Sequence, residues 1–327
     1  MNKEAYQAAA TGAVYLDRST TGCIEITGRD RLALVNRLST NAVLNLKLGQ
    51  GQITVLTTNI GRIMDLITVL AIDDQTIWVI TSANRGSEIA KYLGSNKFFN
   101  DEFTVREITA SISQMRVYGD QATAILERLT GSTLADLPLW SHITTEIAEC
   151  PVRLVRIRPI YGASWAVFND VAAADAVIEA VDAAGAMLLD RDTFNVLRVE
   201  SGYPNVAELN LDYIPLEANL WDAVSFSKGC YVGQEIIARM ESRGRLAKKL
   251  MGLALSGAVR PPADLTSDGK NAGDLTSVVW SPSHNQHIGL GYVRTAYEAG
   301  ATLHVGEHTA TVVELPFVHD QGFGIRD

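Results

Sequence analysis

The spacing of apolar residues changes near residue 245, and this change most constrains the fold. Before it, strand-like and helix-like stretches are mixed without the strict alternation of a parallel doubly wound sheet. After it, short apolar runs follow one another closely, separated by Pro, Gly and Asn, as in a small antiparallel barrel or sandwich. These runs are 251–255, 277–280, 288–293, 302–305 and 309–315, and the stretch 256–273 is expected to be a loop. The sequence therefore predicts an α+β region over 1–245 and a β-barrel over 246–327.

The α+β region contains the same local pattern twice. An alternating strand at 23–27 leads through Gly28 to Asp30, a candidate helix cap, and the strand ending at Tyr118 leads through Gly119 to Asp120 in the same way. The similarity suggests two related α+β halves, although any strand-to-helix turn favours Gly and Asp. Other expected strands are 52–56, 65–72, 76–81 and 152–168, and other expected helices are 85–93 and 172–184.

Composition excludes several classes of protein. The length of 327 residues suggests two or three domains, and 47% hydrophobic with 20% charged residues is ordinary for a soluble globular protein. The net charge of −9 gives no general attraction for nucleic acid or anionic membranes, so nucleic-acid binding is not indicated. The start of the chain lacks a signal-peptide pattern, and no apolar stretch approaches the roughly 20 residues needed to cross a bilayer. We therefore expect a cytoplasmic protein that has no membrane partner.

Cysteine and histidine usage argues against a resident metal. Cys23, Cys150 and Cys230 lie far apart without a CxxC motif, which disfavours a disulfide framework. Three scattered thiols also cannot supply the four ligands of an ordinary iron–sulfur cluster. His284 and His287 lie in a stretch rich in Ser, Pro and Asn, without a carboxylate nearby in sequence, so a solvated loop is favoured over a zinc site.

The octet Lys-Gly-Cys-Tyr-Val-Gly-Gln-Glu at 228–235 is the most informative local motif. An amphipathic helix is expected to open near Gly233, which would place Cys230 near the positive end of a helix and two residues from Lys228. Both features favour the thiolate. The alternative is a small buried hydrophobe beside a glycine turn. Because no His lies within twenty residues, a Cys–His pair is not indicated, whereas a redox thiol or a transient metal or sulfur ligand needs only accessibility.

Two acidic residues stand out. Glu200 lies in an apolar context before a Gly/Pro turn, where a carboxylate needs a partner; the alternative to a ligand site is a salt bridge to Arg198 or another Arg. Asp65 follows a glycine turn at 59–64, and the alternative there is an exposed position on an alternating strand. Basic residues after the octet, namely Arg239, Arg243 and Arg245, could bind an anionic ligand or form a solvated helix face.

The octet resembles the signature of the YgfZ family of folate-binding proteins, which includes a mitochondrial iron–sulfur assembly factor. That family is related to the aminomethyltransferase, or T protein, of the glycine cleavage system. The segments 59–65, 197–204 and 215–219 are similar to T-protein stretches as well, so the resemblance extends across the chain. It implies two intertwined α+β regions, one of them ferredoxin-like, followed by a C-terminal antiparallel β-barrel.

The resemblance also implies roles for individual residues. Glu200 matches the Glu that binds the pterin ring of tetrahydrofolate, or of a one-carbon derivative of it. Asp65 matches an acid that contacts the folate nitrogens and assists aminomethyl transfer. In the same stretch Leu66 replaces a second acid and Arg62 replaces a second glycine, which disfavours transfer but not folate binding. Catalytic candidates are Cys230 and Asp65; cofactor-binding candidates are Glu200, Asp65, Lys228, Tyr231, Gln234 and Arg239.

Three functions remain open. The first is a tetrahydrofolate-binding accessory protein that supports maturation or repair of iron–sulfur proteins, with the thiol of Cys230 taking part and assembly or client proteins as partners. The second is a folate-dependent aminomethyltransferase or another one-carbon transferase. The third is a folate-independent interaction module whose octet docks a partner. The sequence does not decide whether the chain is an enzyme.

Overall fold

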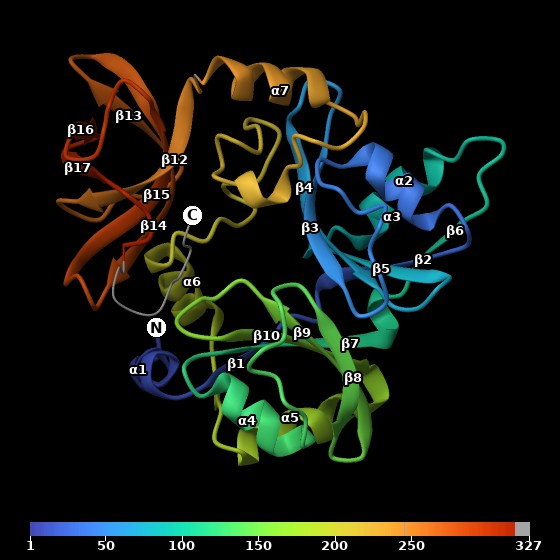
Figure 1. The fold of residues 1–327 in the computed structure, drawn as a ribbon. Coiled ribbons are helices and arrows are strands. Elements are labelled where there is room, and N and C mark those ends of the chain that lie inside the picture. The colour runs from blue at the N-terminus through green and yellow to red at the C-terminus, as the bar shows by residue number, and fades with distance from the viewer. Residues whose placement is uncertain (245, 318–327) are drawn as a thin grey trace. The chain divides into compact units, whose positions relative to one another are not determined.

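The structure is a computed structural model that describes residues 1–244 and 246–317, apart from the side chain of Arg243. Contacts along the chain define two compact units (Figure 1). The first unit comprises residues 1–57, 65–191 and 222–232, and the second comprises 58–64, 192–221 and the chain from 233 onward. The predicted α+β fold ending in an antiparallel barrel is confirmed. Each unit is therefore assembled from segments that are distant in sequence.

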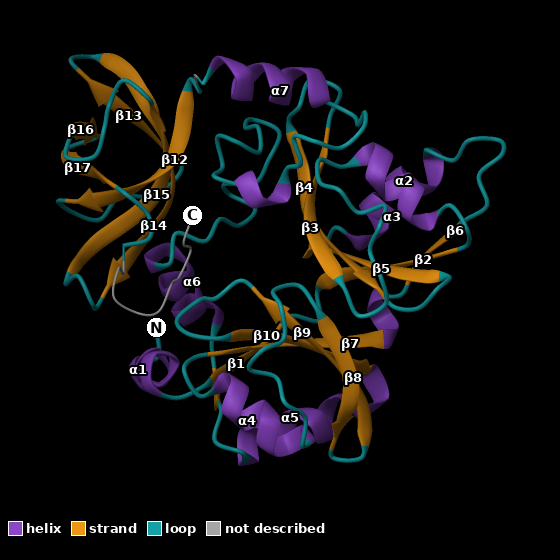
Figure 2. Cartoon of the chain, viewed as in Figure 1, coloured by secondary structure: helices purple, strands orange, loops and turns teal. Residues whose placement is uncertain are grey.

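The first unit contains two open sheets with helices packed beside them (Figure 2). The six-stranded sheet has the order β11-β1-β7-β10-β9-β8, and the five-stranded sheet has the order β3-β4-β5-β2-β6. Its helices are α1 (Lys3–Thr11), α2 (Arg31–Leu38), α3 (Gly86–Ser95), α4 (Ala122–Thr130) and α5 (Ala174–Ala183). Its strands are β1 (Val14–Asp17), β2 (Thr21–Thr27), β3 (Gly51–Thr57), β4 (Ile63–Ala71), β5 (Thr76–Ala83), β6 (Thr104–Glu107), β7 (Ile112–Tyr118), β8 (His142–Ile147), β9 (Cys150–Ile157), β10 (Ser164–Asp170) and β11 (Met187–Leu188).

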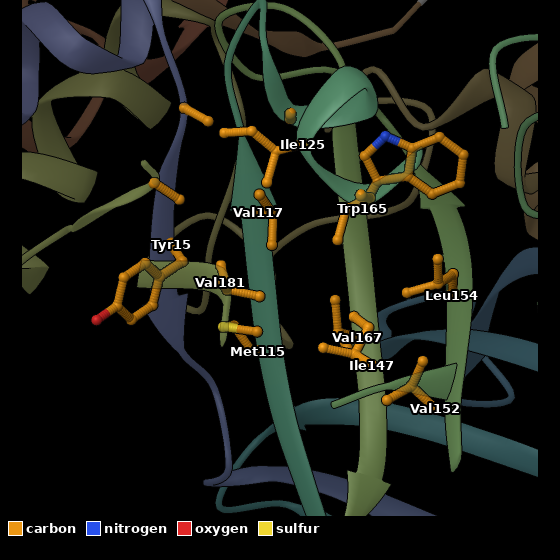
Figure 3. Packing of buried hydrophobic residues seen from close by; sticks show 14 of the residues in the cluster. Tyr15, Met115, Val117, Ile125, Ile147, Val152, Leu154, Trp165, Val167 and Val181 are labelled. Atoms are coloured by element: carbon orange, nitrogen blue, oxygen red, sulfur yellow. The ribbon is translucent and has the colours of Figure 1, made fainter. Parts of the chain in front are cut away.

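Strand β10 is buried on both faces and organises the core of the first unit. Trp165 and Val167 point into a cluster with residues of α4 and α5 (Figure 3). Ala166 and Phe168, on the opposite face, pack with residues of the five-stranded sheet. Alternation along one strand therefore sends two sets of side chains into two cores, because successive side chains of a strand point to opposite faces.

The two strand–Gly–Asp–helix patterns occur in equivalent positions. Gly28 follows β2 with φ of 110°, and Gly119 follows β7 with φ of 114°. A Cβ at Gly28 would lie 2.4 Å from the carbonyl oxygen of Glu102, and one at Gly119 would lie 2.5 Å from that of Gly12. Both turns therefore require glycine, by conformation and by close backbone approach.

Two details of the sequence interpretation are wrong in this unit. The run 152–168 is two strands, β9 and β10, separated by a turn in which Tyr161 and Gly162 have positive φ. Helix α4 begins after Gln121 rather than after Asp120. The first error arises because a short turn interrupts the apolar pattern too briefly to change its periodicity, and the second is a one-residue shift at a helix boundary.

The second unit is built around a closed six-stranded barrel with the order β12-β15-β14-β13-β16-β17. Two helices, α6 (Arg191–Glu200) and α7 (Gln234–Arg243), precede the barrel in sequence. The barrel strands are β12 (Lys248–Leu255), β13 (Ala263–Ser267), β14 (Lys270–Ser281), β15 (Gln286–Arg294), β16 (Thr302–Val305) and β17 (His308–Val313). Among all described residues, no helix is long and apolar enough to cross a membrane.

The stretch 256–273, expected to be a loop, is one only over 256–262, and residues 263–273 belong to a hairpin. Ser267 pairs with Lys270, so Asp268 and Gly269 make a two-residue turn between β13 and β14. Both turn residues have positive φ, 49° and 72°, which the Asp-Gly pair accommodates. Leu265 of β13 lies in the barrel core. The Asp-Gly pair was the available signal, but the polar residues on both sides of it concealed the strands.

A buried histidine in the first unit makes stability depend on pH. His142 in β8 is 3% exposed, and its Nδ1 lies 2.8 Å from Nη1 of Arg153. Burial, followed by the charge of Arg153, lowers the pKa of His142 to about 4. In the unfolded chain a histidine has a pKa of about 6.5, so the unfolded state binds more protons between these values and stability falls as pH drops through this window.

We therefore expect His142→Gln to flatten the acid side of the stability profile. Between pH 6.5 and pH 4 the wild type should lose up to about 3 kcal/mol through this one group, and the variant should not. Urea unfolding at several pH values measures the free energy of unfolding of both proteins. Only the difference between their profiles is diagnostic, because burial raises the pKa of Asp65 and of Glu217, which stabilises the folded state as pH falls. Parallel profiles would contradict the assignment.

Candidate functional site

The octet 228–235 joins the two units. Residues 228–232 belong to the first unit, and the chain from Gly233 belongs to the second. Helix α7 begins at Gln234, directly after Gly233, which has φ of 83°. The prediction of a helix opening near Gly233 is therefore confirmed, and the glycine is needed for the left-handed backbone conformation at its start.

Within the first unit, Lys228 is bound to backbone carbonyls. Its Nζ donates to the carbonyl oxygens of Asn36 at 2.5 Å, Ser39 at 2.9 Å and Asn41 at 2.7 Å. Burial lowers the pKa of Lys228 to about 8, which leaves the side chain protonated at neutral pH. An ammonium has three N–H donors, so these three acceptors match its full donor capacity. Lys228 therefore holds the octet segment on residues 36–41, which we call the α2 exit segment.

Cys230 and Tyr231 are adjacent but differ in exposure. Cys230 is an exposed free thiol, which excludes the alternative of a buried hydrophobe. The Tyr231 side chain is buried, its ring centroid lies 5.1 Å from Nζ of Lys228, and burial raises its pKa to about 12. The segment thus presents an exposed thiol between a half-buried cation and a buried ring, and accessibility is what redox or transient ligand chemistry requires.

Asp65 in β4 is buried rather than exposed on an alternating strand. Its side chain is 2% exposed, and its two oxygens accept from the backbone N–H of Ser82 at 3.1 Å and from Oγ of Ser82 at 2.5 Å. Burial raises the pKa of Asp65 despite these hydrogen bonds and the positive charge of Arg85. The carboxyl group is therefore fixed to β5 and more easily protonated than an ordinary aspartate, as a group that holds a proton would be.

Within the second unit, Glu200 ends helix α6 and is fully buried. Its Oε1 accepts from Oγ of Ser281 at 2.5 Å and from Oγ of Ser283 at 3.0 Å. Nδ1 of His284 lies 3.1 Å and 3.0 Å from the same two hydroxyl oxygens. His284 lies in the turn between β14 and β15, as expected, but it has a carboxylate in its hydrogen-bond cluster, which the sequence did not indicate. Glu200 and His284 are 84 positions apart, and no local pattern signals their proximity.

The ionic partner of Arg198 is Glu208, a residue that the sequence interpretation did not single out. Nη1 of Arg198 lies 3.2 Å from Oε2 of Glu208, and the two side chains are 3% and 0% exposed. Ser277 of the barrel binds both groups, accepting from Nη2 of Arg198 at 2.8 Å and donating to Oε1 of Glu208 at 2.6 Å. Of the alternative proposed for Glu200, a bridge to Arg198 or another Arg, the pairing with Arg198 is therefore wrong.

The remaining sequence candidates lie on α7 and in the segment 215–219. Gln234 is partly buried and Arg239 is exposed, whereas the side chain of Arg243 and all of Arg245 lie outside the described residues. In the segment 215–219, Glu217 accepts from the backbone N–H of Ile214 at 3.1 Å, and its carbonyl accepts from Leu250 N–H at 2.8 Å. This segment therefore binds β12 through a backbone hydrogen bond.

Across residues 1–244 and 246–317, no group of three or more His, Cys, Asp or Glu residues could hold a metal ion. Among the candidates, Cys230 is an exposed thiol, and the carboxyl groups of Asp65 and Glu200 accept hydrogen bonds from serine hydroxyls. Such groups can accept hydrogen bonds from N–H donors of a ligand and can hold protons.

Comparison with known proteins identifies the family. The model of the GCVT N-terminal domain matches residues 1–228, and that of the glycine cleavage T-protein C-terminal barrel domain matches residues 248–319. A putative chloroplastic transferase of Arabidopsis thaliana is 30% identical over 97% of this chain and 74% of its own length. An aminomethyltransferase of Listeria welshimeri is 28% identical over 96% of this chain and 89% of its own length.

A solved structure agrees with these matches in fold. The glycine cleavage system aminomethyltransferase T from Bartonella henselae superposes with a TM-score of 0.85, at 19% identity, over 96% of this chain and 89% of that one. The N-terminal domain model alone covers well over half of the chain, and the barrel model covers most of the remainder. This chain therefore belongs to the glycine cleavage T-protein family.

Proposed function

We propose that this chain is a YgfZ-type member of the family that binds tetrahydrofolate, or a one-carbon derivative, and supports maturation or repair of iron–sulfur proteins. The observation that carries the proposal is the octet 228–235 with its exposed thiol at Cys230. The thiol would interact with an assembly or client protein, or transiently with sulfur or metal. Tetrahydrofolate, when bound, supplies a carrier for one-carbon units.

The residues present fit a pterin in chemical type. Glu200 is a buried carboxylate that accepts hydrogen bonds from Ser281 and Ser283, and a carboxylate has about four acceptor positions. One carboxylate can accept two parallel hydrogen bonds from neighbouring ring N–H and amino groups. Under this proposal Glu200 binds the pterin, Asp65 binds or protonates a folate nitrogen, and Gln234 and Arg239 contact the remainder of the folate.

Isothermal titration with tetrahydrofolate tests the proposal. The wild type should bind with a micromolar or lower Kd, and Glu200→Gln should weaken binding about 10- to 100-fold, because a neutral amide replaces a charge-assisted acceptor. Glu179→Gln changes an exposed glutamate on α5 in the other unit and should bind as the wild type does. Absence of binding by the wild type would reject the folate proposal. Unchanged binding by Glu200→Gln would reject only the pterin-binding role of Glu200.

The iron–sulfur part of the proposal has its own readout. Cys230→Ser should retain tetrahydrofolate binding but fail to restore an iron–sulfur enzyme's activity in cells that lack the protein. The substitution replaces an exposed thiol with a hydroxyl of similar size, so folding should be unaffected. Full restoration of the enzyme's activity by Cys230→Ser would show that the function does not require the thiol.

Aminomethyl transfer is the second candidate, and one observation favours it. The raised pKa of Asp65 suits a group that holds a proton near a reacting nitrogen. Leu66 in place of the second acid argues against it. An assay for methylenetetrahydrofolate formation from an aminomethyl donor tests this candidate. Turnover that Asp65→Asn abolishes would establish this activity in place of the accessory role.

A further inference from the structure

We propose that Lys228 is a positioning residue whose ammonium serves as an internal cation, fixing residues 222–232 and hence Cys230 on the α2 exit segment. This inference concerns how the thiol is presented and does not depend on folate binding. It also revises the role that the family resemblance implies for Lys228, which would act through the protein backbone rather than on a ligand.

Two of the three acceptors, the carbonyls of Asn36 and Ser39, lie at the C-terminal end of helix α2, and the third belongs to Asn41 just beyond it. Asn36 lies in the last turn of α2, Ser39 is its C-cap, and Asn41 follows two residues later. The last four carbonyls of a helix have no intrahelical donors, and the helix dipole favours a cation at this end. Distances of 2.5 to 2.9 Å place all three oxygens at charge-assisted hydrogen-bond range of one nitrogen. The α2 exit segment therefore forms a binding site for an ammonium group.

Other hydrogen bonds hold the two ends of the segment 222–232 on the same residues. On its N-terminal side, the side chain of Asn41 donates to the carbonyl of Asp222 at 2.8 Å, and Thr40 Oγ1 donates to that of Ala223 at 2.6 Å. On its C-terminal side, Val232 N–H donates to the carbonyl of Arg37 at 3.1 Å. Lys228 supplies the attachment between these ends, and it is two residues from Cys230.

Removing the ammonium should free this part of the segment without unfolding the core. Lys228→Ala leaves three carbonyls without their donor and removes three methylenes together with the nitrogen. The deleted group corresponds to propylammonium, which can re-enter the site and donate to the same three oxygens. Tetramethylammonium has the same charge but no N–H. The planar guanidinium introduced by Lys228→Arg cannot direct three donors as an ammonium does.

Hydrogen exchange and thiol modification test the proposal together. In Lys228→Ala, the amides of Ser225 and Val232 should exchange at least about tenfold faster, whereas amides of β10 should be unchanged. The rate of Cys230 alkylation by iodoacetamide should move toward that of a peptide containing residues 226–235. Propylammonium should restore both quantities toward wild-type values; tetramethylammonium and the Lys228→Arg substitution should not.

A matched control comes from the neighbouring residue. A Cβ at Gly229 would meet nothing within 4 Å, so Gly229→Ala changes the same segment without touching the carbonyls and should behave as the wild type. Unchanged exchange and alkylation in a folded Lys228→Ala, or equal rescue by tetramethylammonium, would overturn the proposal. If Lys228→Ala does not fold, refolding with propylammonium decides: recovery supports the proposal and no recovery overturns it.

Discussion

Arg198→Met is expected to destabilise the protein by about 3–5 kcal/mol, because it leaves a buried charge without its partner. Glu208 is fully buried, and its carboxylate is bound by Arg198, Ser277 and Thr276. Methionine fills a similar volume but offers no donor. The hydroxyls of the barrel remain, yet neutral donors do not compensate a carboxylate as a guanidinium does. Such a loss approaches the whole stability of many domains.

Chemical denaturation of Arg198→Met, Glu208→Gln and the double variant measures this coupling. The double variant should be less destabilised than the sum of the single variants, because the second substitution removes the charge that the first leaves unpaired. Arg239→Met removes an exposed arginine of α7 and should change the free energy of unfolding by no more than about 0.5 kcal/mol. Additive losses would show that the pair is not coupled.

Trp165→Ala should cost a similar amount, about 3–5 kcal/mol, by creating a cavity in the first unit. Trp165 is fully buried among the residues that α4 and α5 contribute to the core (Figure 3). Its Nε1 also donates to Oγ1 of Thr123 at 3.0 Å. The alanine variant therefore loses apolar contacts and leaves a hydroxyl without its donor.

Thermal and urea unfolding of Trp165→Ala and Trp165→Phe separate these contributions. Trp165→Phe retains most of the apolar volume and loses the hydrogen bond, so it should be clearly less destabilised than the alanine variant. Thr123→Val removes the hydroxyl acceptor while keeping the tryptophan, so it tests the hydrogen bond alone. Equal losses in Trp165→Ala and Trp165→Phe would mean that the hydrogen bond, rather than packing, dominates at this site.

Elements with local signals were predictable from the sequence. The barrel followed from closely spaced short apolar runs, and the start of α7 followed from Gly233 and the amphipathic pattern after it. The two glycine turns after β2 and β7 were also recognised. In each case the residues that determine the feature lie within a few positions of it. Local sequence preferences act over this short range.

Features that depend on long-range contacts were not predictable. Lys228 binds carbonyls of residues 36, 39 and 41, about 190 positions earlier, and backbone acceptors leave no sequence signature. Arg198 pairs with Glu208 rather than Glu200, although both acids lie within ten residues of it. Which acid it binds depends on where the barrel serines lie. The chain segments 58–64 and 192–221, which belong to the second unit, likewise carry no compositional boundary.

Closure of the barrel determines which strands of this protein could pair with strands of another copy. A closed ladder gives every barrel strand a neighbour on both sides, although β13 and β16 pair only at Thr266 and His304, so among the described residues the barrel lacks the free edge strands of an open sheet. The two sheets of the first unit instead end in β11, β8, β3 and β6. Fibrillar aggregation by strand addition should therefore begin in the N-terminal unit, and protecting those four strands would be the way to prevent it.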